Sequence, residues 1–92
     1  MRRGFDHLFA EISVGLGRLA PRYALWLRLR EIGIDPESLT REQSIAFCRA
    51  HLGAFLREHG LALGPRSARR VERAVARHDP SVRSPAEWAA RL

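Results

Sequence analysis

Hydrophobic residues recur every three or four positions at the start of the chain, a spacing typical of a helix with one buried face. On a helical wheel they fall within an arc of about 100°. These residues are Phe5, Leu8, Phe9, Ile12, Leu16 and Leu19. The pattern predicts an amphipathic helix over 4–19. Gly15 and Gly17 weaken its last turns, and Pro21 suits the first position of a second helix, 21–32.

The second predicted helix is apolar over more than one face. Its main apolar side carries Leu25, Leu29 and Ile32. Tyr23 and Leu27 point away from that side. Such a helix is either covered by neighbours on both sides or keeps an apolar surface for a partner. Tyr23, Trp26 and Leu27 are therefore a candidate protein interface, either the seam of a homodimer or a groove for another protein.

A third helix, predicted over 40–59, has the clearest start. Thr40 and Gln43 have the spacing of a capping box, in which each side chain bonds a free backbone amide near the other residue. One face of this helix carries Ile45, Cys48, Leu52, Phe55, Leu56 and His59. Phe47 stands apart from this face. Removing the cap with Thr40→Ala is expected to cost about 1 kcal/mol of stability.

Glycine and proline mark the remaining boundaries. Gly33 before Ile34 and Gly60 before Leu61 predict Schellman ends for the second and third helices. A fourth helix is expected over 65–78, between a Gly-Pro pair and Asp79-Pro80. A second capping box starts a short helix over 84–92 that carries Trp88 and Leu92. We therefore expect one all-α domain, 1–92, folded as a compact bundle of four to five short helices without strands.

Charge changes this picture near the end of the chain. The 92 residues include 16 arginines, no lysine and 10 acidic residues, for a formal net charge of +6. Residues 1–64 hold nine arginines and seven acids, whereas residues 65–92 hold seven arginines and three acids. A preference for GC-rich codons explains why arginine replaces lysine, but it does not explain this clustering. Net positive charge favours anionic partners.

Five arginines fall on one side of the predicted helix 65–78, within an arc of about 100°. They are Arg66, Arg69, Arg70, Arg73 and Arg77. Ala68, Val71 and Val75 lie on the other side and are expected to anchor the helix to the core. Helically spaced positive charge suits the phosphate backbone of DNA or RNA, the first candidate partner, and an acidic protein surface is the other. A solvated surface in an arginine-biased proteome explains the pattern equally well.

Other chemistry is poorly supported by the sequence. Cys48 and His59 are 11 residues apart, about 16 Å along a continuous helix, which is too far for one metal ion. No spacing brings a nucleophile, a base and an orienting carboxylate together, so we expect neither an enzyme, a metal nor a cofactor. A single cysteine allows no internal disulfide, which is typical of a reducing compartment. Charged residues interrupt the apolar segment that a signal peptide would need, and no apolar run is long enough to span a bilayer. We therefore expect a cytoplasmic protein that does not use a membrane.

Two function classes therefore remain open. The leading one is a small non-catalytic binding protein that contacts nucleic-acid phosphates through helix 65–78 without reading base sequence, since only Ser67 has a side chain suited to base edges. The alternative is a helical interaction subunit or adaptor that uses the apolar seam of Tyr23, Trp26 and Leu27. Nucleic-acid binding should weaken steeply with salt, whereas an apolar seam should be sensitive to Leu27→Ser.

Overall fold

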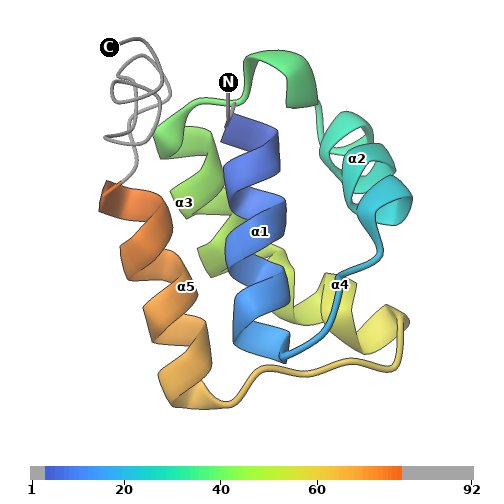
Figure 1. Ribbon diagram of the computed structural model, residues 1–92. Helices are drawn as coiled ribbons and strands as arrows, with labels where there is room; N and C mark the ends of the chain where they lie inside the picture. The colour runs from blue at the N-terminus through green and yellow to red at the C-terminus, as the bar shows by residue number, and fades with distance from the viewer. Residues whose placement is uncertain (1–3, 78–92) are drawn as a thin grey trace, which may run out of the picture.

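The computed structural model describes residues 4–77, which form five α-helices and one short 3₁₀ helix without any strand (Figure 1). The all-α prediction is confirmed. The elements are α1 (Gly4–Leu16), α2 (Arg22–Glu31), η1 (Pro36–Ser38), α3 (Arg41–Ala50), α4 (Leu52–Glu58) and α5 (Pro65–Arg77). The helix expected over 84–92, including Trp88, lies outside the described residues. No helix within 4–77 is long and apolar enough to cross a membrane.

The capping motifs act as the sequence predicts. The Thr40 hydroxyl accepts a hydrogen bond from the Gln43 amide at 3.1 Å, and the Gln43 side chain accepts one from the Thr40 amide at 3.0 Å. Gly33 has a positive φ of 86°, and the Ile34 amide donates back to the Leu29 carbonyl at 2.9 Å. The same arrangement closes α4 at Gly60. Both Schellman ends are therefore confirmed.

The first helix ends earlier than predicted. It stops at Leu16, because Gly17 adopts a left-handed conformation with φ of 72° and the Arg18 amide bonds back to the Ser13 carbonyl. The predicted extension to residue 19 was wrong. Leu19 consequently leaves the apolar stripe and is 77% exposed.

The predicted helix 40–59 was also wrong as a single element. The chain breaks at His51, whose φ and ψ of −125° and −25° separate α3 from α4. Phe47, which a straight helix sets apart from the apolar face, is instead fully buried beside Phe55, with ring centroids 6.3 Å apart. The break lets both helices turn an apolar face to one core.

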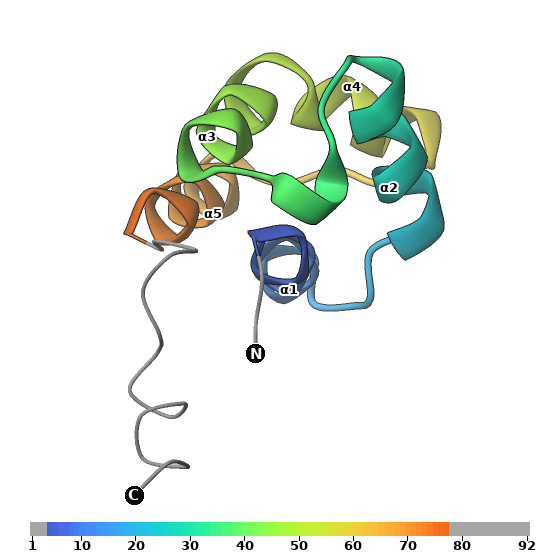
Figure 2. The same ribbon diagram turned by 90° about the horizontal axis from the view of Figure 1, so that it is seen from above.

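The core is continuous across all the α-helices. α5 packs against α1 and α3, and α2 lies on the other side of α1 from α5 (Figure 1). Seen from above, α1 lies at one edge of the molecule (Figure 2). Side chains below 2% exposure include Leu8, Ile12, Leu25, Leu29, Phe47, Phe55, Leu56 and Val71. Gly15 permits the close approach of α1 to α5, because a Cβ atom there would lie 2.8 Å from Cγ2 of Val71.

Candidate functional site

The fourth predicted helix is observed as α5, and its apolar side anchors it to the body of the protein. Val71 and Val75 are 1% and 2% exposed, and Ala68 is half-buried, as the sequence predicts. His7 Nε2 on α1 also lies 3.2 Å from the Ala74 carbonyl oxygen. Contacts to α1 and α3 thus fix which side of α5 faces outward.

The outward side carries the five predicted arginines. Arg66, Arg69, Arg70, Arg73 and Arg77 are all exposed. Within residues 4–77 none of them lies in an ion pair, whereas Arg22, Arg28, Arg41 and Arg49 each contact a carboxylate. We call these five residues the arginine face. Its guanidinium groups keep their donors available for a partner.

Glu72 is the one acidic residue of α5, and it faces α3 instead of the arginine face. Its Oε1 atom accepts a hydrogen bond from Nε of Arg49 at 2.5 Å. The sequence places Glu72 on the flank of the helix but gives no hint of its partner, because Arg49 is 23 residues away. This pairing leaves the arginine face without a neutralising carboxylate from its own helix.

The net charge of α5 differs from that of the rest of the described chain. Residues 4–64 contain seven arginines and seven acidic residues, while α5 contains five arginines and one glutamate. With neutral histidines, the excess positive charge of residues 4–77 therefore belongs to α5 alone. Within the part of the chain that the structure describes, the positive potential is therefore centred on this helix.

Of the three residues of the second predicted surface, on α2, two are exposed and one is partly packed against the core. Tyr23 is 74% exposed and Leu27 is 39% exposed. Trp26 is half-buried, and its ring meets that of Phe5 edge to face, with centroids 5.1 Å apart. Tyr23 and Leu27 therefore remain available to a partner, while Trp26 also contributes to the core.

Cys48, His51 and His59 do not converge in the structure. Within residues 4–77 no group of three metal-binding side chains lies close enough to share an ion. The His51 ring stacks against Phe47, and His59 Nδ1 lies 3.0 Å from the Phe55 carbonyl oxygen. Burial, with a smaller contribution from the negative charge of Glu72, raises the pKa of the Cys48 thiol to about 12. Such a thiol is a poor nucleophile at neutral pH.

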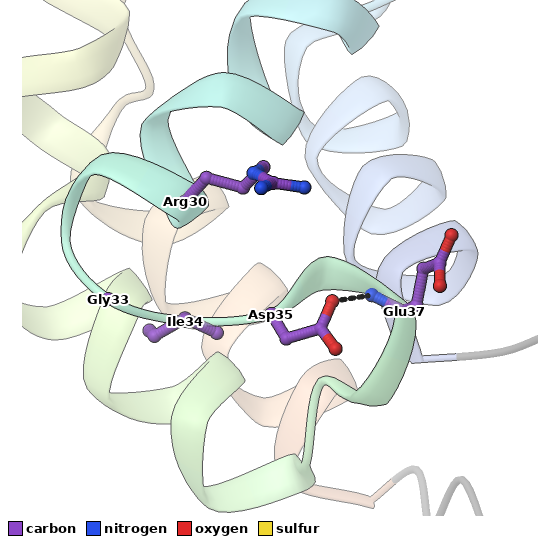
Figure 3. A pocket seen from close by; sticks show the side chains of 5 residues that line it. All are labelled: Arg30, Gly33, Ile34, Asp35 and Glu37. Atoms are coloured by element: carbon purple, nitrogen blue, oxygen red, sulfur yellow. Dashed lines mark hydrogen bonds between the residues drawn. The ribbon is translucent and has the colours of Figure 1, made fainter.

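A polar hollow of about 470 Å³ lies between the end of α2 and η1 (Figure 3). Arg30 extends over it from α2, and Asp35 and Glu37 border it on the other side. Asp35 is already engaged, since its carboxylate accepts from the Glu37 amide at 3.0 Å and from the Ser38 hydroxyl at 3.1 Å. The hollow is thus built around a capped turn, a structural role that the sequence indicates through Asp35-Pro36.

The arginine face and the exposed part of α2 are therefore the two surfaces with features suited to a partner. The helices that carry them, α5 and α2, lie on either side of α1 (Figure 2). Comparison of the chain with protein-family models, with curated proteins and with solved structures finds no match.

Proposed function

We propose that the protein is a non-catalytic binding protein whose arginine face contacts an anionic partner, with the phosphate backbone of DNA or RNA as the first candidate. The observation that carries this proposal is the isolation of charge on α5. All five arginines are exposed, none is paired within residues 4–77, and the remainder of that region is electrically balanced. Clustered like charges repel one another, so an anionic partner would relieve a cost that the fold leaves uncompensated.

Phosphate contact without base reading fits this surface best. Arg66 and Arg77 are about 16 Å apart along the helix axis, so the face can follow a row of phosphates. Ser67 is half-buried and lies at the flank of the arginine face. Arginine can hydrogen-bond guanine, but no exposed asparagine or glutamine accompanies it on α5. The expected partner is therefore nucleic acid of any sequence.

Fluorescence anisotropy with labelled single- and double-stranded oligonucleotides at two salt concentrations tests this proposal. The test variant carries Arg66→Gln, Arg70→Gln and Arg73→Gln. A matched control carries Arg18→Gln, Arg30→Gln and Arg57→Gln, three exposed arginines outside α5 that also lack an ion pair within residues 4–77. Both variants lose three positive charges, so net charge alone cannot distinguish them.

The expected result is salt-sensitive binding that is abolished in the α5 variant and retained in the control. Four to five phosphate contacts give a slope of log K against log salt of roughly −4 for duplex DNA. Equal losses in both variants would show that net charge, and not α5, attracts the nucleic acid. No binding at low salt would remove nucleic acid and direct attention to an acidic protein.

The exposure of Tyr23 and Leu27 favours a second candidate function, a protein-interaction subunit that uses α2. Such a surface would bind through apolar contact and would respond little to salt. Sedimentation of the pure protein tests its homodimer form. A dimer that dissociates in Leu27→Ser would support a seam between two copies, whereas a monomer at every concentration would oppose it.

A further inference from the structure

A notch with aromatic walls opens beside the exposed part of α2. It has a volume of about 340 Å³ and is lined by Phe5, Arg22, Tyr23 and Trp26. A second hollow, of about 370 Å³, shares Phe5, Arg22 and Trp26 and continues to Asp6, Pro36 and Glu37. The two hollows adjoin at these three shared residues, and together they extend from Tyr23 on α2 to Glu37 on η1. We call the two together the aromatic groove.

Arg22 forms a fixed wall of this groove. Its guanidinium carbon lies 5.0 Å from the ring centroids of both Phe5 and Phe9. Its Nη2 atom donates to Asp6 at 2.6 Å. Two rings and one carboxylate hold the side chain in place, although its remaining N–H groups stay available. Asp6 also balances its charge, so the wall does not repel a basic ligand.

The polar groups at the α2 end of the groove are mainly hydrogen-bond donors. The half-buried Trp26 supplies an indole N–H, and the exposed Tyr23 supplies a hydroxyl. A complementary ligand therefore supplies acceptors and flat apolar surfaces, and needs few donors of its own.

A proline-rich segment has this chemistry. Proline has no amide N–H, and in the polyproline II conformation the backbone carbonyls form no internal hydrogen bonds. Aromatic-lined grooves commonly bind such segments because their conformation is formed in advance. The η1 end of the groove is negatively charged, because the exposed Glu37 carboxylate has no ion pair within residues 4–77. A basic residue of the ligand would meet it there.

We propose that the aromatic groove binds a proline-rich segment of another protein in the polyproline II conformation, with its prolines between Tyr23 and Trp26 and an arginine or lysine against Glu37. This inference rests on the second candidate function, the α2 interaction surface, and not on the arginine face. It replaces a homodimer seam with a peptide partner of defined chemistry.

Fluorescence anisotropy with a labelled synthetic peptide tests the proposal on the full chain. The probe contains an arginine followed by two prolines spaced three residues apart. One comparison peptide has alanine in place of both prolines, and another has glutamate in place of the arginine. The protein variants are Tyr23→Ala, Trp26→Phe, which keeps the ring but removes the N–H, and Glu37→Gln. Leu19→Ser is the matched control, because Leu19 is 77% exposed and lines neither of the two hollows.

The expected result is saturable binding of the arginine–proline peptide that weakens about tenfold or more in Tyr23→Ala, as is typical of an aromatic contact residue. Trp26→Phe should weaken both proline peptides. Glu37→Gln should weaken the arginine–proline peptide but not the glutamate–proline peptide, and Leu19→Ser should bind as the wild type does. Failure of the proline peptides to bind, or equal binding of the alanine peptide, would overturn the proposal. A dimer lost in Leu27→Ser without peptide binding would retain the α2 interface but reject this ligand.

Discussion

Arg49 on α3 and Glu72 on α5 form a hydrogen-bonded ion pair, with Nε and Oε1 2.5 Å apart. The pair joins two helices that are separated in sequence, and it also removes the one carboxylate of α5 from competition with a ligand. Both side chains are partly open to water, at 69% and 31% exposure, so the pair contributes no more than about 1 kcal/mol to stability. Its main effect is on the charge of α5.

Glu72→Gln should therefore strengthen oligonucleotide binding. The substitution removes one negative charge from α5 and releases Arg49 as a further phosphate contact. The slope of log K against log salt should become steeper by up to about one. Anisotropy titrations of the wild type and of Glu72→Gln provide the comparison, with Glu42→Gln, a change of equal charge on the exposed side of α3, as the control. An equal gain in the control would attribute the effect to net charge alone.

Gly15→Ala should destabilise the protein although alanine favours helices. The new methyl group would lie 2.8 Å from Cγ2 of Val71 and 3.2 Å from Cδ2 of Leu63, so α1 and α5 would have to separate. Such overpacking costs about 1–3 kcal/mol, more than the gain in helix propensity. Urea unfolding measures the difference.

Gly53→Ala is the matched control for that experiment. Gly53 is exposed, and the nearest atom to a new Cβ is the mobile guanidinium of Arg57, at 3.4 Å. This substitution should stabilise the protein by about 0.4–1 kcal/mol, because alanine lowers the conformational entropy of the unfolded chain. If both substitutions stabilised the protein, the contact between Gly15 and Val71 would not be close.

Thr40→Ala should lower the free energy of unfolding by about 1 kcal/mol, because the Gln43 amide loses its acceptor at the start of α3. Thr40→Ser keeps the hydroxyl and should be nearly neutral. Chemical denaturation of the three proteins is sufficient to measure this. Similar unfolding midpoints for the alanine and serine variants would contradict the importance of the cap.

Cys48 should make stability fall at alkaline pH. The thiol ionises near its ordinary pKa of 9.0 in the unfolded chain but only near 12 in the folded protein. Between these values the folded state holds the additional proton, so the contribution is complete below pH 9 and is lost as pH rises toward 12. Denaturation from pH 8 to 10.5 should show a steeper loss for the wild type than for Cys48→Ala. Parallel curves would mean that the thiol is not withdrawn from water.

The sequence predicts best those parts of the fold that depend on neighbouring residues. Thr40 with Gln43, and Gly33 with Ile34, form local hydrogen bonds, so their roles follow from spacing alone. The sides of α5 are also predictable, because Val71 and Val75 share one side of any helix at those positions. The predicted arginine face is exposed for the same reason.

Features that depend on packing between distant residues could not be predicted in this way. No glycine or proline marks His51, and the break there lets α3 and α4 bring Phe47 and Phe55 into one core. The partners of Glu72 and of Arg22 lie on other helices, so periodicity within one helix does not reveal them. The aromatic groove likewise requires α1, α2 and η1 together.

The concentration of charge on α5 also has a kinetic consequence. Within residues 4–77 the charge is balanced except on one positive helix, so the field of an approaching polyanion exerts a torque on this asymmetric distribution. The molecule would rotate to present α5 before contact, over a distance of about 10 Å at 0.1 M ionic strength. Added salt should then slow association more than it speeds dissociation, and productive encounters would begin from almost any starting orientation.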